Sequence, residues 1–103
     1  MSILYVEEYS QIGYNKRRQQ VLSPLEPAQA SQAITYTTSS VQSAAFQKDT
    51  CFVRVHTDSD CHIEFGTNPT AVNQTTKRMA ADQTEFFAVP QGEAYKVAVI
   101  QSS

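Results

Sequence analysis

The chain has 103 residues, a formal net charge of −2 at pH 7 and a hydrophobic content of 41%. A chain of this length is expected to form one domain, and its near-neutral charge argues against a dedicated nucleic-acid binder. No run of about 18 apolar residues is present, so no helix is expected to span a membrane. The first residues lack the basic start and apolar stretch of a signal peptide, and we expect a protein made and folded in a cytoplasm.

The first strand is predicted at residues 2–9, where β-branched and aromatic side chains gather. A basic triplet follows at residues 16–18, and then two prolines that favour an extended path. We therefore expect an extended N-terminal arm over residues 1–30 and a body over residues 31–103. The alternative is that residues 2–9 form an edge strand of the body, because N-terminal strands are often tied into sheets.

We expect this arm to bind a partner protein. Tyrosine is favoured where a segment packs on a partner, and a basic triplet can meet an acidic patch. The expected partner-binding residues are Tyr5, Tyr9, Tyr14, Lys16, Arg17 and Arg18. A solvated, flexible basic arm is the alternative interpretation of the triplet.

The middle of the chain is weakly hydrophobic. Residues 28–43 are mostly Ala, Ser, Thr and Gln, with one strand candidate at residues 33–37. A helix over residues 39–48 would place apolar side chains at helical spacing, but it would be short and poorly capped. We therefore favour loop or strand there.

Alternation of apolar and polar residues predicts antiparallel strands in the second half of the chain. These strands are expected at residues 51–57, 61–65, 84–89 and 94–100. We expect them to pair as two hairpins, joined by a long loop that holds a short strand at residues 76–80. This pattern predicts an all-β fold, an antiparallel β-sandwich or jelly roll.

The same alternation predicts which side chains are buried, because a strand with one buried face has a strongly specified register. The expected core residues are Val53, Val55, Ile63, Phe65, Phe86, Val97 and Val99. The residues expected to face outward are Arg54, Glu64 and Lys96.

One predicted hairpin gathers residues that invite a metal interpretation: His56, Asp58, Asp60, Cys61 and His62. Their spacing matches no zinc ribbon or finger, and a solvated face with paired opposite charges is the expected alternative.

No catalytic arrangement is evident in the sequence either. The glycines are scattered, so no phosphate-binding loop is present. Cys51 and Cys61 are expected to be small buried hydrophobes that form no disulfide. We expect no enzyme activity and no catalytic, cofactor or metal site.

Several motifs resemble a family of small structural proteins of tailed bacteriophages. The motifs are Phe52-Val53-Arg54-Val55-His56-Thr57-Asp58, Ile63-Glu64-Phe65-Gly66-Thr67-Asn68-Pro69-Thr70-Ala71, Ala81-Asp82-Gln83-Thr84-Glu85-Phe86-Phe87 and Tyr95-Lys96-Val97-Ala98-Val99-Ile100. Residues 3–9 and 41–46 are similar as well. The resemblance implies a virion protein of the capsid decoration or cement type, with a jelly-roll or β-sandwich body and an extended arm. No functional residue is carried over, because these are strand and turn motifs.

The expected function is therefore that of a non-enzymatic decoration protein that binds and stabilises the assembled shell of the phage major capsid protein. It is expected to be made in the host bacterial cytoplasm, to be located in the virion and to form a homo-oligomer. No nucleic acid, membrane or small-molecule substrate is expected as a partner. The alternatives are a minor tail or head–tail junction protein, and an intracellular β-sandwich module that binds a host protein.

Overall fold

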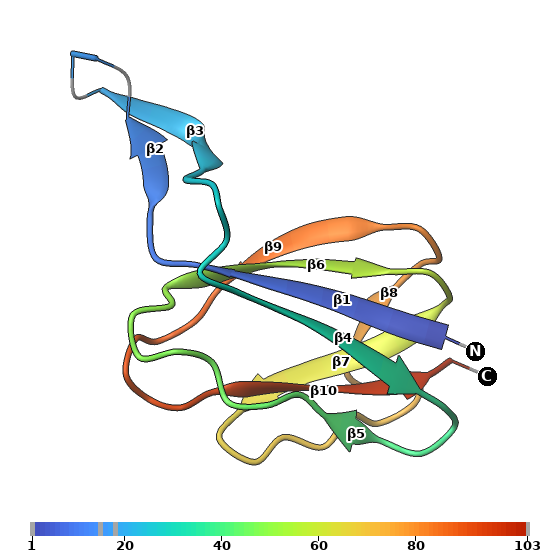
Figure 1. Cartoon of the computed structure of the whole chain (residues 1–103). Helices are drawn as coiled ribbons and strands as arrows, with labels where there is room; N and C mark the ends of the chain where they lie inside the picture. The colour runs from blue at the N-terminus through green and yellow to red at the C-terminus, as the bar shows by residue number, and fades with distance from the viewer. Residues whose placement is uncertain (1, 15, 18, 103) are drawn as a thin grey trace.

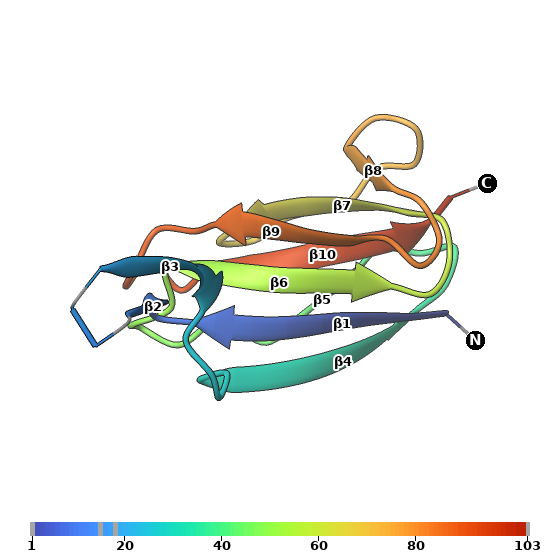
Figure 2. The same cartoon turned by 90° about the horizontal axis from the view of Figure 1, so that it is seen from above.

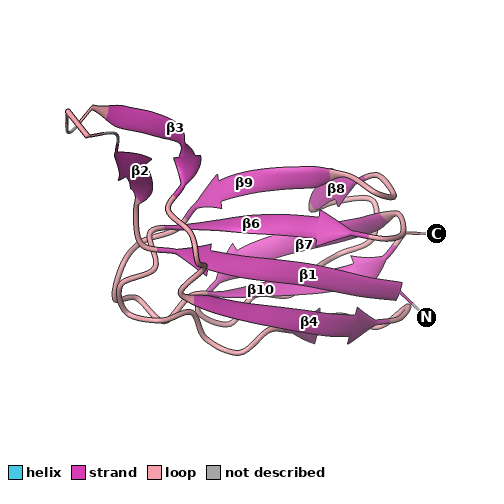
Figure 3. Ribbon diagram, turned by 45° about the horizontal axis from the view of Figure 1, so that its top comes forward, coloured by secondary structure: helices cyan, strands magenta, loops and turns pink. Residues whose placement is uncertain are grey.

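The computed structural model of the chain describes residues 2–14, 16–17 and 19–102, with the backbone alone for Tyr14, Val21 and Leu22. Two four-stranded antiparallel sheets pack face to face, and a two-stranded sheet projects from them (Figure 1). Every regular element in the described ranges is a strand (Figure 3). The prediction of an all-β antiparallel sandwich is confirmed.

The first sheet has the strand order β4-β1-β6-β9 and the second has the order β5-β10-β7-β8. The strands of the first sheet are β1 (Ser2–Tyr9), β4 (Ala30–Tyr36), β6 (Phe52–Thr57) and β9 (Thr84–Ala88). Those of the second sheet are β5 (Val41–Gln42), β7 (Cys61–Gly66), β8 (Lys77–Met79) and β10 (Lys96–Gln101). The projecting hairpin consists of β2 (Ile12–Tyr14) and β3 (Gln20–Pro24).

From β4 onward, the chain changes sheet at every connection except the one between β7 and β8. This is the strand order of a jelly roll, with one difference. The place beside β4 that the last strand of a jelly roll normally fills is taken by β1, the first strand of this chain. The fold is therefore a β-sandwich with the strand order of a permuted jelly roll.

The prediction that these strands pair as two hairpins is wrong. The strands β6 and β7 lie in different sheets, and so do β9 and β10. Alternation in the sequence fixes which face of a strand is buried, but it does not fix the neighbouring strand. The inward side chains Val55 and Ile63 belong to one core cluster across the sandwich, so a connection between sheets satisfies the pattern as well as a hairpin would.

The prediction of an extended N-terminal arm is also wrong for residues 2–9. The strand β1 pairs with β4 on one side and with β6 on the other, so it is an interior strand and not the alternative edge strand. Its side chains Leu4 and Val6 are 0% exposed in the core. The body therefore comprises residues 2–9 together with residue 30 onward, and the segment between them carries the hairpin that leaves the body.

Most of the expected core is confirmed. The residues Val53, Val55, Ile63, Val97 and Val99 are 0% exposed, and Phe65 packs partly buried against them. Phe86 is the exception, with 54% of its surface exposed. In the pairing of β9 with β6, Phe86 lies opposite the outward Arg54 and Phe87 lies opposite the buried Val53. Phe87 is therefore the phenylalanine that packs on the core.

Candidate functional site: the projecting hairpin and the groove at its base

The β2–β3 hairpin extends from the sandwich at the end opposite to both termini (Figure 1). Its strands pair at Ile12 with Pro24 and at Tyr14 with Gln20, with an irregularity in register between them. Lys16 and Arg17 lie exposed in the turn at its tip. Arg18, the third member of the expected basic triplet, lies outside the described residues, and so does the side chain of Tyr14. The hairpin thus carries positive charge to a point far from the body.

Tyr9 holds the base of this hairpin. Its ring is 1% exposed and stacks on Phe52, with ring centroids 5.3 Å apart. Its hydroxyl donates a 2.8 Å hydrogen bond to Oε2 of Glu26, which lies just after β3. Burial, followed by this hydrogen bond, raises the pKa of Tyr9 to about 12, so the hydroxyl stays protonated and donates at neutral pH. Tyr9 was expected to contact a partner, but the structure buries it as an internal anchor.

Backbone hydrogen bonds complete the attachment of the hairpin. The amide of Leu25 donates to the carbonyl of Gln11 over 3.1 Å, and the amide of Gln29 donates to the carbonyl of Glu8 over 2.7 Å. The first bond joins the two arms of the hairpin at its base, and the second ties the returning arm to β1.

A groove of about 480 Å³ lies between the hairpin and the outer face of the first sheet. It is lined by Ile12, Ser23, Pro24, Phe52, Phe86, Phe87 and Ala88. The rings of Phe52 and Phe86 lie 6.4 Å apart between centroids, and Phe86 is the most exposed of the large hydrophobic side chains in the part of the chain described here. We call this feature the hairpin groove. It is apolar and open to solvent, and it lies at the base of the hairpin whose tip carries Lys16 and Arg17.

The outer face of the first sheet continues beyond the hairpin groove. Arg54 and Glu7 form an ion pair of 2.9 Å across β6 and β1. Further along β1, Tyr5 is 42% exposed and lies against His56, with ring centroids 6.2 Å apart. The structure therefore separates the expected partner-binding residues: Tyr5 lies on the open sheet face, Tyr9 is buried, and Lys16 and Arg17 lie at the tip.

The groove residues were missed in the sequence, although one signal was available. Phe86 and Phe87 are adjacent in a strand, and adjacent strand residues point to opposite faces. Only one of the two rings can be buried in a sandwich core, so one phenylalanine had to lie on the outer surface.

The residues that invite a metal interpretation in the sequence are divided between the two sheets. His56 lies on β6 in the first sheet and His62 lies on β7 in the second, so the hairpin that would have placed them face to face does not exist. Within the described residues no group of at least three His, Cys, Asp or Glu side chains is arranged to hold a metal ion.

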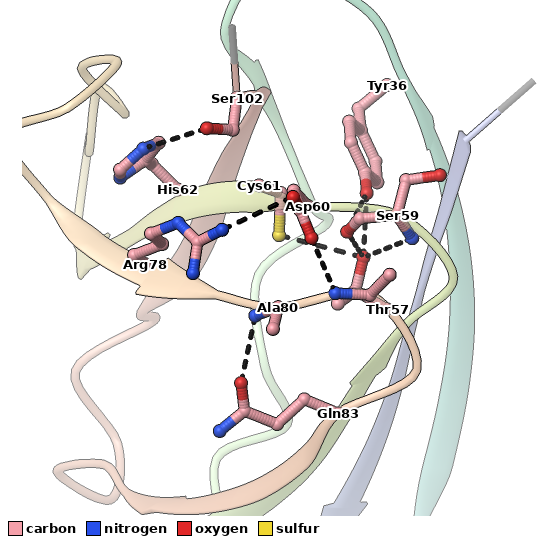
Figure 4. A network of polar contacts seen from close by, with 11 residues as sticks. Tyr36, Thr57, Ser59, Asp60, Cys61, His62, Arg78, Ala80, Gln83 and Ser102 are labelled. Atoms are coloured by element: carbon pink, nitrogen blue, oxygen red, sulfur yellow. Dashed lines mark hydrogen bonds and ion pairs between the residues drawn. The ribbon is translucent and has the colours of Figure 1, made fainter.

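The turn between β6 and β7 instead holds a buried polar network (Figure 4). The hydroxyls of Tyr36 and Thr57 lie 2.7 Å apart, and the carbonyl oxygen of Ser59 lies within hydrogen-bond distance of both, at 3.0 and 2.7 Å. The Sγ of Cys61 lies 3.6 Å from Oγ1 of Thr57. Burial raises the pKa of the Cys61 thiol, which keeps it protonated and a poor nucleophile. This network fixes the connection between the two sheets.

A second polar cluster lies beside a cavity of about 520 Å³ between β7, β8 and the end of β10. His62 is 4% exposed and has Ser102 Oγ 3.4 Å from Nε2 and the Thr76 carbonyl 2.9 Å from Nδ1. A hydrolytic triad needs a carboxylate on the second nitrogen to orient the ring. The neighbouring Asp60 instead binds Arg78 over 3.2 Å and the amide of Ala81 over 2.8 Å. This cluster therefore joins loops to the sheet and lacks the arrangement of a catalytic triad.

Cys51 and Cys61 are both free thiols. The Cys51 thiol donates to the carbonyl of Ser10 over 2.9 Å.

No described element is a helix long and apolar enough to cross a membrane. No family model, curated protein or solved structure matches this chain.

Proposed function

We propose that this protein is a non-enzymatic virion structural protein of the capsid decoration type. In this proposal it binds the assembled shell of a phage major capsid protein through the hairpin groove and the basic hairpin tip. The observation that carries the proposal is the hairpin itself, an anchored projection with exposed aromatic surface at its base and positive charge at its end. The phage-like strand and turn motifs supply the class of partner.

The chemistry of this region suits docking on a large protein surface. An apolar groove with an exposed phenylalanine provides the buried contact of an interface, since aromatic anchors dominate such contacts. Lys16 and Arg17 at the tip favour an acidic patch on the shell and orient the approach. Because the hairpin is already anchored by Tyr9, docking costs less conformational entropy than ordering a free arm would.

Because a shell repeats the same binding surface, modest contacts at each site are sufficient for firm attachment. A shell presents the same acidic and apolar surface many times, and a protein that touches neighbouring subunits gains by simultaneous attachment. The elongated shape of the molecule, with principal extents of 48 × 27 × 21 Å, suits a protein that lies across such a boundary. Each molecule then stabilises the shell by a small amount, and the sum over the particle is large.

Phe86 gives the sharpest test. Covering the exposed half of its ring is worth about 2 kcal/mol, so Phe86→Ser should weaken binding to each site by about 30-fold. Val72 is the matched control, because it is 45% exposed and lies outside the groove, in the loop between β7 and β8. Val72→Ser should bind as the unchanged protein does. Binding is measured by co-sedimentation with shells that lack the protein.

The number of copies per particle separates the alternatives. Quantitative mass spectrometry of purified virions should find the protein in a fixed ratio to the major capsid protein. A few copies per particle would indicate a head–tail junction or minor tail protein. Absence from virions would indicate an intracellular module that binds a host protein. Equal shell binding by the Phe86 and Val72 variants would overturn the proposed role of the groove.

A further inference from the structure

The free edge of β4 is the longest edge in the two main sheets. The strand has seven residues, Ala30–Tyr36, and pairs with β1 alone (Figure 2). The other edge strands are shorter, with five residues in β9, two in β5 and three in β8. Natural proteins usually protect such edges with lysine, proline or a bulge. β4 contains no charged residue and no proline.

The hydrogen bonds of β1 show which groups of β4 point outward. In an antiparallel strand alternate residues bond to opposite neighbours. The carbonyl of Tyr9 accepts from Cys51, just before β6, while the carbonyl of Glu8 accepts from Gln29, just before β4. The even-numbered residues of β1 therefore bond to β4, and in this register their partners are the even-numbered residues of β4. The backbone groups of Ser31, Ala33 and Thr35 are directed away from the sheet.

Nothing in the described part of the chain pairs with this edge. The loop that contains Ala44 contacts β4 through a side chain, because the side-chain amide of Gln32 bonds to the backbone of Ala44. Gln32 lies on the inner side of β4, opposite Val6, which is in the core. The loop that contains Ala44 is thus tied to the inner side of β4 and leaves its edge open.

This edge is complementary to itself. When two β4 strands meet antiparallel about a two-fold axis at Ala33, Ala33 lies opposite Ala33 of the second copy and Ser31 lies opposite Thr35 of the second copy. Every outward N–H then meets an outward carbonyl, since directly opposed residues of this type exchange both bonds. The side chains beside them are small and uncharged, so no like charges oppose each other, and each Ser–Thr pair can form a further hydrogen bond.

We propose that two copies of this chain pair through β4 and join their first sheets into one continuous sheet. A two-fold interface uses the same surface on both copies, which a self-complementary edge requires. The hairpin groove lies on β6 and β9, the opposite side of the first sheet from β4, so it remains open in the dimer. The inference concerns the isolated protein and is independent of the proposed binding to a shell.

Oligomeric state tests the proposal directly. Sedimentation velocity of the isolated protein should show a monomer that becomes a dimer as concentration rises. Ala33→Lys should leave a folded monomer, because the side chain at this position is exposed and two like charges would face each other at the axis. Ala81→Lys adds the same charge at an exposed loop position and should leave dimerisation unchanged. A monomer at all concentrations, or equal dimerisation of both variants, would overturn the proposal.

Cysteine cross-linking tests the register without relying on a disruptive variant. In a Cys51→Ser background, Ala33→Cys places two thiols on directly opposed residues, about 5.5 Å apart between Cα atoms and within disulfide reach. Ser31→Cys places them four residues apart along the strands, about 13 Å, which is too far. Mild oxidation should cross-link the Ala33 variant alone. Equal cross-linking of the two variants, or none in either, would contradict the two-fold axis at Ala33.

Discussion

Replacing Tyr9 with phenylalanine tests how the hairpin is anchored. The ring of Tyr9 is 1% exposed and stacked on Phe52, so Tyr9→Phe leaves the packing in place and creates no cavity. It removes only the 2.8 Å hydrogen bond to Glu26. Because Glu26 lies on the segment that returns from β3 to the body, the lost bond is one that closes the base of the hairpin.

The expected cost follows from the surroundings of the two groups. A hydrogen bond to a charged group contributes about 1.5–3 kcal/mol when both partners are buried. Glu26 is exposed, so water replaces part of the lost bond, and we expect Tyr9→Phe to lower the free energy of unfolding by about 1 kcal/mol. Glu26→Ala removes the acceptor and should cost about the same, and the double variant should show a coupling energy of about 1 kcal/mol between the two positions.

Denaturant unfolding of the four proteins at neutral pH gives the coupling energy, and native-state hydrogen exchange locates the change. The amides of Leu25 and Gln29, which bond to Gln11 and Glu8 at the hairpin base, should exchange faster in Tyr9→Phe. Amides in the centre of β6 should not change. A coupling energy near zero with unchanged exchange at Leu25 and Gln29 would refute the anchoring role of this hydroxyl.

Other substitutions probe the body. Burial is the largest of the causes that raise the pKa of Tyr36 from 10.0 to about 12. The stability that the protonated hydroxyl contributes is therefore fully present below pH 10 and is lost as the pH rises through 12. In Tyr36→Phe, the free energy of unfolding measured with denaturant at alkaline pH should depend less steeply on pH. The carboxylate of Glu8 is 1% exposed and accepts hydrogen bonds of 2.7 and 2.8 Å. Glu8→Gln should therefore lower the free energy of unfolding by about 2–3 kcal/mol, and Glu7→Gln, on the outer face, by less than about 1 kcal/mol. Phe65→Ala should lower the free energy of unfolding by about 3 kcal/mol and Phe86→Ala by less than about 1 kcal/mol, because only the ring of Phe65 packs on the core. Equal losses of stability within the glutamate pair or within the phenylalanine pair would contradict the assigned faces.

The buried faces of the strands could be predicted from the sequence, because period-two alternation is a local property. Val53 and Val55 flank Arg54, and the structure buries the two valines. The same alternation failed at Phe86 and Phe87, where two adjacent apolar residues offer two registers. Pairing of β9 with β6 decides between them, and that pairing is not encoded within residues 84–89 themselves.

Strand partners could not be predicted, since they depend on segments far apart in the chain. Residues 2–9 have the composition of a strand whether they lie at an edge, in an arm or at the centre of a sheet. Their central position depends on β4 and β6, which follow much later in the sequence. The same holds for the hairpin groove. The basic triplet was visible as a local cluster, but the groove exists because Ile12 and Pro24 come to lie beside Phe52 and Phe86.

The central position of β1 has a consequence for how the chain reaches its folded state. Both neighbours of β1 follow it in the sequence, and the contact between Ile3 and Asp58 spans 55 residues. The first sheet therefore cannot be completed until β9, which ends at Ala88, has been synthesised. Loop closure over such separations is slow, and sandwiches dominated by distant contacts fold in milliseconds to seconds. Until then β1 is a strand-forming segment without a sheet, and its side chains Leu4 and Val6 have no core to pack into.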